Sequence, residues 1–99
     1  VLRLGEHWKK TFGTVAAFQV LEHFDRANFD EALRRMVMVA RDRLVLSVPR
    51  GMPTPAVREK DGHLIGWNDD AEFAKDIGRF GRVVPLKGEE NHICAILHL

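Results

Sequence analysis

The sequence has a single cysteine, no excess of either charge and no long apolar run. The cysteine, Cys94, lies inside an apolar stretch, which is typical of a reduced core residue rather than a reactive thiol. The formal net charge is +1 and Lys and Arg are spread along the chain, so nothing indicates nucleic-acid binding. No run approaches the roughly 18 apolar residues that a membrane span needs, and no signal peptide opens the chain. We therefore expect a cytoplasmic protein with no membrane partner.

Repeats and low-complexity segments are also absent, and the length allows one domain at most. A chain of 99 residues, 45% of them hydrophobic, can bury a modest core. It begins with Val1 rather than Met, and residues 1–4 already read as part of an element. Both features indicate a piece of a longer protein. We expect residues 1–14 to form an irregular segment within a single partial domain, residues 1–99.

An apolar run at residues 15–21 organises the rest of the chain. Its length and its content of Val and Phe predict a buried strand of a parallel sheet. In open α/β sheets, ligands bind beyond the carboxyl ends of the strands. The first polar residues after this strand are Glu22 and His23, so we expect the chemistry there.

A helix and a second strand complete a βαβ unit over residues 15–49. Residues 28–41 carry apolar side chains at the spacing of one helical stripe, and Asn28 with Glu31 fits a capping box. Residues 43–48 read as a strand that a proline ends. Strands joined by a helix in this way should run parallel with a right-handed crossover.

The second half of the chain is predicted to be a long loop, a helix and a hairpin. Residues 50–67 contain several prolines and glycines and follow the carboxyl end of a strand, which favours a substrate-side binding loop or lid. Residues 68–99 then give a helix, capped by the leading asparagine, and an antiparallel hairpin of strands 82–86 and 92–99. Because Pro85 cannot donate to a ladder, its strand should lie at the sheet edge.

Three motifs occur in a recognisable order. They are Val-Leu-Glu-His at residues 20–23, Leu-Val-Leu-Ser-Val-Pro at 44–49, and a His-x-x-x-Trp pattern at 63–67 ahead of a capped helix. Together they resemble the C-terminal, substrate-side half of class I S-adenosylmethionine (SAM)-dependent methyltransferases of type 11/23, with similarity to O-methyltransferases that carry a Glu-x-x-Glu-His motif. The resemblance covers residues 14–99. It implies an α/β fold: a partial Rossmann-like sheet with strands equivalent to 4, 5, 7 and 6, two main helices and an antiparallel C-terminal hairpin.

The resemblance also implies SAM as the cofactor, with most of its site missing from this chain. The family binds SAM through a glycine-rich loop after its first strand, and no Gly-x-Gly-x-x-Gly pattern occurs here. The only similar stretch, at residues 78–81, follows a helix and reads as a helix stop. As cofactor-binding residues the resemblance implies Glu6, Phe18 and Gln19.

In the metal-using branch of the family, the Glu-x-x-Glu-His motif and a later His bind a divalent cation. Carried over by position, Glu22 and His23 match the second Glu and its His, and His63 matches the later His. Gln19 stands where the first Glu would be, and its neutral amide oxygen weakens the site for a hard cation such as Mg²⁺. The resemblance thus implies Glu22, His23 and His63 as catalytic residues, and these three with Gln19 as metal ligands.

Each candidate also has a purely structural interpretation. Glu22 could cap the next helix or form a hydrogen bond to the next loop, His23 could be a hydrogen bonder at a strand end, and His63 could be an ordinary loop residue. Trp67 reads either as a hydrophobic staple against the following helix or as a wall for the substrate. Arg50 is the second candidate for substrate binding.

Three functions follow from these observations. The first is an O-directed methyltransferase acting on a small molecule, present as a fragment that is inactive alone. The alternative is a non-catalytic α/β binding or assembly module, because the strand at 15–21 would present a bare edge that recruits another strand, from a second copy or from a missing N-terminal half. A small metal-dependent hydrolase is a weaker third hypothesis, because the cluster lacks a third charged ligand.

Overall fold

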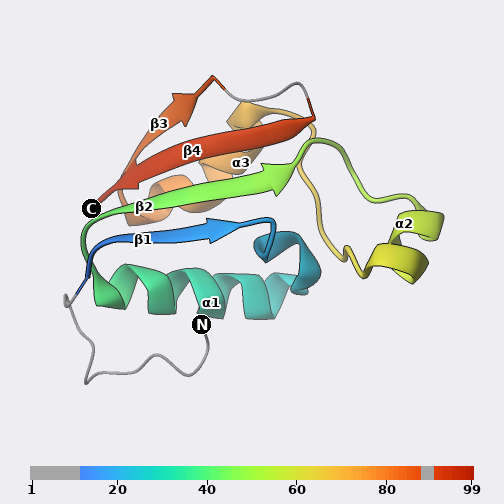
Figure 1. The fold of residues 1–99 in the computed structure, drawn as a ribbon, viewed down its shortest axis with the longest axis horizontal. Coiled ribbons are helices and arrows are strands. Elements are labelled where there is room, and N and C mark those ends of the chain that lie inside the picture. Colours follow the sequence, from blue (N-terminus) through green and yellow to red (C-terminus); the bar gives the residue numbers. More distant parts are fainter. Residues whose placement is uncertain (1–11, 88–90) are drawn as a thin grey trace.

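The computed structural model of the chain describes residues 12–87 and 91–99. In chain order the elements are β1 (Phe12–Phe18), η2 (Leu21–His23), α1 (Arg26–Val39), β2 (Ala40–Pro49), α2 (Pro55–Asp61), α3 (Asp70–Ile77), η3 (Gly78–Phe80), β3 (Arg82–Leu86) and β4 (His92–His98) (Figure 1). The helices labelled η are single turns of 3-10 helix.

The strands form one sheet in the order β1–β2–β4–β3. β1 runs parallel to β2, while β4 is antiparallel to both β2 and β3. This order confirms the expected 4-5-7-6 arrangement, with a parallel pair followed by an antiparallel hairpin. β3, which contains Pro85, is an edge strand, as the missing backbone donor of proline predicts.

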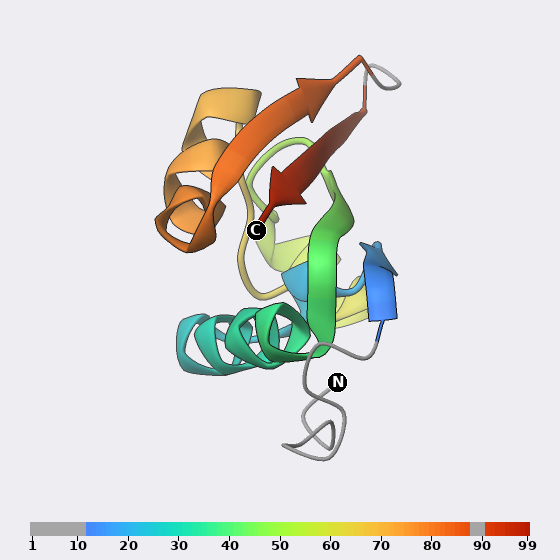
Figure 2. The ribbon, with the colours of Figure 1, turned by 90° about the vertical axis from the view of Figure 1, so that its left-hand side faces the viewer.

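The core lies between one face of the sheet and the helices α1 and α3, which both pack against that face (Figure 2). Phe29, Leu33 and Met36 from α1 are buried against it, and so are Phe73 and Ile77 from α3. Removing a side chain of this size from water stabilises a fold by roughly 1.5–3 kcal/mol. The predicted apolar stripe of the first helix is therefore the core-facing surface.

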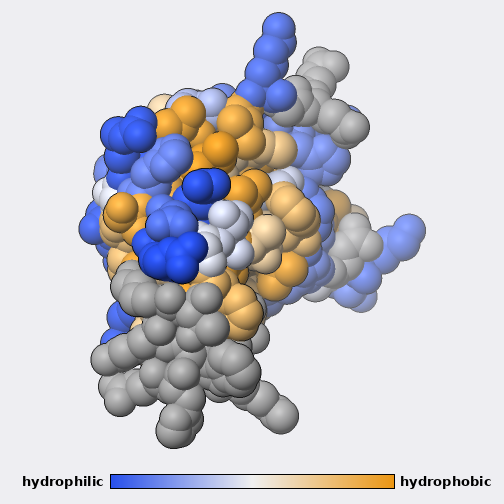
Figure 3. All heavy atoms as spheres, turned by 60° about the vertical axis from the view of Figure 1, so that its left-hand side comes forward, coloured by the Kyte–Doolittle hydropathy of each residue, from blue (hydrophilic) through white to orange (hydrophobic). Residues whose placement is uncertain are grey.

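The opposite face of the sheet is also apolar but remains partly exposed. Val45, Ile96 and Val84 are paired neighbours across three strands, so their side chains share this face, and each is partly exposed. Figure 3 shows apolar side chains gathered at the surface between charged ones. None of the helices in the described ranges has the length and apolar content that crossing a membrane requires.

Both helix starts differ from the prediction by one or a few residues. Asp25, not Asn28, caps α1: its carboxylate accepts the N–H of Asn28 at 2.8 Å. In α3 the cap is Asp69, which accepts the N–H of Glu72 at 2.9 Å, rather than the preceding asparagine. A carboxylate that reaches the exposed N–H groups of the first turn decides where each helix begins.

The first strand lies earlier than predicted. It covers Phe12–Phe18 rather than residues 15–21, because the chain turns at Gln19, whose φ is 57°. Two hydrogen bonds to Ser47 stabilise this left-handed backbone: the Gln19 N–H donates to its carbonyl at 2.9 Å, and the Gln19 amide donates to its hydroxyl at 2.8 Å. Leu21 therefore belongs to η2 and not to the strand.

The predicted long loop contains a helix, α2, so its assignment as a continuous loop is wrong. Thr54 caps this helix by accepting the N–H of Val57 at 3.2 Å, and Pro55 occupies its first turn. Gly62 ends it in the left-handed conformation, with φ 71°. A capping threonine, a proline at the first position and a glycine after the end are a recognised helix signature, which the proline content of the stretch obscured.

Candidate functional site

The candidate site lies at the carboxyl ends of β1 and β2, the edge of the sheet where α/β folds bind ligands. The turn after β1 places Glu22 and His23 on η2, and the segment after α2 brings His63 to the same place. The carbonyl of Glu22 accepts the N–H of Leu64 at 2.7 Å. This backbone hydrogen bond fastens the His63 segment to η2 across about forty residues of chain.

The side chains of Glu22, His23 and His63 form a compact cluster. Oε2 of Glu22 lies 3.7 Å from Nε2 of His23 and 4.0 Å from Nε2 of His63. The two imidazole rings meet edge to face, with centroids 4.7 Å apart. One ligand atom from each residue falls within 4.8 Å of the other two, which is compatible with a single bound ion.

Glu22 is the unusual member of the cluster. The residue is only 2% exposed, and its Oε1 finds no hydrogen-bond partner among the described residues. A buried carboxylate oxygen without a partner costs a fold stability, and in native proteins such an atom calls for an explanation such as an ion or a catalytic role. The cap interpretation of Glu22 is not what the structure shows, since Asp25 caps the following helix.

A hydrogen bond to the backbone orients His23. Its Nδ1 lies 3.3 Å from the carbonyl oxygen of Gly62. Because a carbonyl only accepts, this contact favours the tautomer with the proton on Nδ1, which leaves the lone pair of Nε2 directed toward Glu22. Metal-binding histidines are commonly fixed in this manner.

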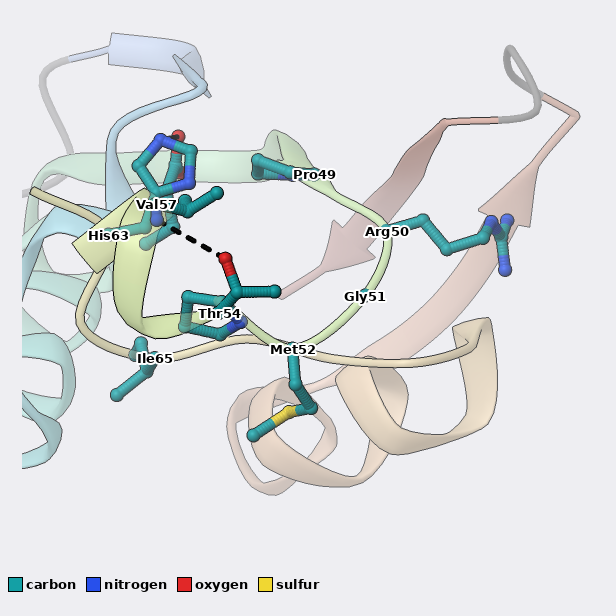
Figure 4. Close-up of a pocket in the computed structure, with 10 residues that line it drawn as sticks. Pro49, Arg50, Gly51, Met52, Thr54, Val57, His63 and Ile65 are labelled. Atoms are coloured by element: carbon teal, nitrogen blue, oxygen red, sulfur yellow. Dashed lines mark hydrogen bonds and ion pairs between the residues drawn. The ribbon is translucent and has the colours of Figure 1, made fainter. Parts of the chain in front are cut away.

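A pocket of about 250 Å³ opens beside the cluster (Figure 4). Glu22 and His63 contribute to its wall, and the rest comes from the segment after β2 and from α2. Its other lining residues are Pro49, Arg50, Gly51, Met52, Pro53, Thr54, Val57 and Ile65. Within the predicted loop at residues 50–67, sequence reasoning named the lining residues Arg50 and His63 but none of the other lining residues.

Arg50 lines the pocket, but its guanidinium does not enter it. Figure 4 shows the side chain extending away from Thr54 and His63. Its terminal nitrogen donates to a carboxylate oxygen of Asp70 at 3.2 Å and to the carbonyl of His92 at 3.4 Å. The structure therefore links Arg50 to α3 and β4 and leaves the pocket without its charge.

Trp67 lies in the core and does not line the pocket. It is 2% exposed, with ring centroids 5.4 Å from Phe29 and 4.9 Å from Phe73. Its indole N–H donates to Asp76 at 2.6 Å. Of the two interpretations of Trp67, packing against the second main helix is therefore the one that the structure shows.

Asp76 connects this tryptophan to the surface. Its carboxylate also accepts a hydrogen bond from Arg26 at 2.8 Å, so one side chain joins α1, α3 and the core. Burial acts to raise the pKa of Asp76, but the hydrogen bonds from Trp67 and Arg26 and the nearby charges of Arg26 and Arg79 outweigh it. The pKa therefore lies below its usual value.

The residues expected to bind the cofactor do not form a site by themselves. Phe18 is 60% exposed at the end of edge strand β1, and the amide of Gln19 is bonded to Ser47 rather than directed at the cluster. Neither lines the pocket beside His63. Glu6 lies outside the described residues. A SAM site would have to draw on further residues.

No family model matches this sequence, and no curated protein matches it. In fold, the chain is similar to magnesium protoporphyrin IX methyltransferase from Synechocystis PCC 6803. The crystal structure with bound SAH gives a TM-score of 0.59 at 20% identity, covering 98% of this chain and 47% of that chain. The structure with bound SAM gives 0.53 at 21% identity, covering 98% and 40%. The chain thus has a methyltransferase-like fold and spans less than half the length of these neighbours.

Proposed function

We propose that this chain is the acceptor side of a SAM-dependent methyltransferase that methylates an oxygen of a small molecule. The observation that carries the proposal is the buried carboxylate of Glu22, which lies close to the imidazoles of both His23 and His63 and beside a pocket at the carboxyl end of β2. The fold likeness supports it. Because those neighbours are about twice as long, we also propose that the chain is one part of a longer functional unit and is inactive alone.

The cluster would prepare the acceptor by taking its proton. Methyl transfer to a hydroxyl oxygen is faster once that oxygen carries negative charge. His63 lines the pocket and its side chain is 22% exposed, so the imidazole can meet an acceptor. The imidazolium that forms would be stabilised by the Glu22 carboxylate, 4.0 Å away. Nε2 of His23 lies 3.7 Å from the same carboxylate, and the side chain of His23 is more exposed than that of His63.

The cluster also fits a divalent cation. Glu22 offers an oxygen without another partner, and the hydrogen bond to Gly62 leaves Nε2 of His23 available. Two imidazoles and one carboxylate suit Zn²⁺ or Fe²⁺ better than Mg²⁺, which prefers oxygen ligands. A cation held here would polarise the acceptor hydroxyl and ease its loss of the proton.

Calorimetric titration of the 99-residue chain with Zn²⁺ and with Mg²⁺ tests the cluster. We expect one saturable Zn²⁺ site per chain, and binding of Mg²⁺ at least about tenfold weaker. Glu22→Gln should weaken Zn²⁺ binding by about tenfold or more, because a neutral amide replaces the only anionic ligand. His98→Gln is the matched control: it removes an imidazole outside the cluster and should leave the site intact. Weak binding with the same isotherm in all three proteins would refute the cluster as a metal site.

A second candidate role is assembly through the edge of β1. Among the described residues β1 pairs with β2 alone, and Phe18 at the end of the strand is 60% exposed. An unpaired strand edge with exposed aromatic side chains is a template for another strand. Sedimentation equilibrium tests this role. It compares the wild type with Phe18→Lys and with the control Leu86→Lys, a substitution on β3 at the opposite edge of the sheet. Self-association that only Phe18→Lys abolishes supports it, and a wild-type monomer contradicts it.

A further inference from the structure

The sheet has an apolar face that no described helix covers, on the side away from α1 and α3 (Figure 2). Val45, Ile96 and Val84 are paired neighbours on this face, and Ala16 of β1 extends their row across all four strands. None of these four side chains is buried by the residues that the structure describes. Parallel strands such as β1 and β2 are typically buried on both faces. We call the surface that carries this central apolar row the open face.

The apolar part of the open face is wide enough for a helix. One pair further along the strands, the register brings Phe18 and Leu86 into the next row of the same face, where they are 60% and 37% exposed. The two rows lie roughly 7 Å apart, and a helix with its side chains is about 10 Å wide. Contiguous exposed apolar side chains are typical of an interaction surface, and Figure 3 shows apolar atoms gathered between charged ones.

A row of cations borders this apolar surface. The register pairs Arg43 with His98 and His98 with Arg82, on the other side of the central apolar row. Both arginines are exposed, and neither guanidinium has a hydrogen-bond or ion-pair partner among the described residues. The neighbouring acid, Asp42, pairs with Arg41 instead, at 3.3 Å. Because none of the described residues in the three rows is Asp or Glu, a surface that covers the open face has to supply the negative charge.

This charge argues against two copies of the chain packed face to face. A second open face would bring the same arginines and no carboxylate, so neither copy would neutralise the other. The solved structures of similar fold extend beyond the part that this chain matches, which is 47% and 40% of their lengths. A longer unit thus has room for a covering segment. Sheets bury an apolar face against a further layer, and for parallel strands that layer is helical.

We infer that the open face binds an acidic amphipathic helix from outside this chain, whose apolar side lies on the central apolar row and whose carboxylates pair with Arg43 and Arg82. The inference rests on the proposal that the chain is one part of a longer functional unit, and not on the metal-binding cluster. It adds the charge of the covering segment and the place of its ion pairs, which the likeness in fold does not give.

NMR titration of the isotopically labelled 99-residue chain with two synthetic peptides tests the inference. Both peptides have about 20 residues, long enough for a helix in water, and the same stripe of leucine and alanine; glutamate flanks the stripe in one and lysine in the other. We expect the glutamate peptide to cause saturable shifts of the amides of Val45, Val84 and Ile96. The lysine peptide should bind at least about tenfold more weakly. Added salt should weaken binding of the glutamate peptide, because exposed ion pairs are screened.

A charge reversal in the row sharpens the test. Arg43→Glu should weaken binding of the glutamate peptide and strengthen binding of the lysine peptide. Arg58→Glu is the matched control: it makes the same change at an exposed position of α2, outside the open face, and should alter neither affinity. Equal effects of the two substitutions would contradict the inference, because net charge and not the row would then decide the preference.

The remaining outcomes name other occupants or none. The inference is overturned if neither peptide shifts these amides, or if the lysine peptide binds as tightly as the glutamate peptide. Shifts of the same amides that grow with protein concentration alone would mean that a second copy covers the face. Binding of phosphatidylserine vesicles, with no binding of either peptide, would mean that the face meets a lipid surface. Each of these results is independent of the Zn²⁺ titration, so the inference and the cluster can fail separately.

Discussion

At the scale of single residues, Glu22 points to a function because burying its carboxylate lowers the stability of the fold. An acidic side chain that is 2% exposed, with an oxygen lacking any described partner, does not stabilise a fold. Its neighbours are two imidazoles, and one of them is fixed by Gly62. Groups that reduce stability are retained where binding or catalysis needs them, and this cluster fits that pattern.

Asp76 is a residue with the opposite role, and its charge should be visible in the pH dependence of stability. Its pKa in the folded state is depressed, so its contribution is present above the unfolded-state pKa and is lost as the pH falls through the folded-state value. We expect Asp76→Asn to lower the free energy of unfolding at neutral pH by about 1 kcal/mol, because an amide oxygen still accepts the indole N–H of Trp67 but without charge.

Urea unfolding of both proteins from neutral pH to below pH 4 measures this effect. The difference between wild type and Asp76→Asn should shrink in the acid range, where the wild-type carboxylate becomes protonated. A difference that stays constant down to the lowest pH would contradict the role given to the charge. Asp76→Ala should cost more, roughly 1–3 kcal/mol, since it leaves the buried indole N–H without an acceptor.

At the scale of elements, the pocket depends on the close approach of two loop segments. A Cβ on Gly66 would lie 2.6 Å from the carbonyl oxygen of Gly51 and 2.7 Å from Cδ of Pro53. The same segments are joined by a hydrogen bond of 2.6 Å from the N–H of Gly51 to the carbonyl of Trp67. Only glycine at position 66 allows this contact, so it fixes one wall of the pocket.

We therefore expect Gly66→Ala to lower the free energy of unfolding by about 1–3 kcal/mol, as overpacking does. Gly78→Ala is a matched control, because its Cβ would meet only a side-chain atom of Val83 at 3.6 Å, an ordinary contact. Chemical denaturation of the two variants measures the difference between their free energies of unfolding. Equal stability of both would show that the segments are not held together as described.

The sequence carried enough information for the sheet but not for all its boundaries. Apolar patterning predicted the strands, Pro85 predicted the edge position of β3, and the family resemblance implied the strand order. The turn at Gln19 was not predictable, since residues beyond it are as apolar as the strand itself and a left-handed glutamine has no sequence signature. The helix α2 did have one, in Thr54, Pro55 and Gly62, but the prolines favoured a loop.

For the site, the family resemblance named four metal ligands. The structure brings Glu22, His23 and His63 together, while the fourth, Gln19, directs its amide to Ser47 instead. The pocket wall was not predictable, because Met52, Val57 and Ile65 converge only through α2 and the contact at Gly66. The roles of Trp67 and Arg50 also depend on tertiary partners: Phe73 and Asp76 surround the indole, and Asp70 turns the guanidinium away.

At the scale of the whole molecule, the described residues form a four-stranded part of a methyltransferase-like sheet. The neighbours in fold are longer by a factor of about two, and within residues 12–87 and 91–99 no strand pairs with the outer edge of β1. We expect calorimetric titration of the 99-residue chain with S-adenosylhomocysteine to give no saturable heat, because Phe18 and Gln19 alone do not build a cofactor site. Saturable binding near one per chain would mean that this chain completes the site by itself or in a dimer.

The central claim is that Glu22, His23 and His63 act as one ion-binding, acceptor-activating cluster. The most direct measurement is the two-dimensional NMR spectrum of the isotopically labelled chain during addition of Co²⁺, whose paramagnetism shifts and broadens nearby amides. The account predicts that one equivalent affects residues 22–23 and 62–65 most strongly and leaves β3 nearly unchanged. Effects centred on His92 or His98, or no saturable effect at all, would contradict it.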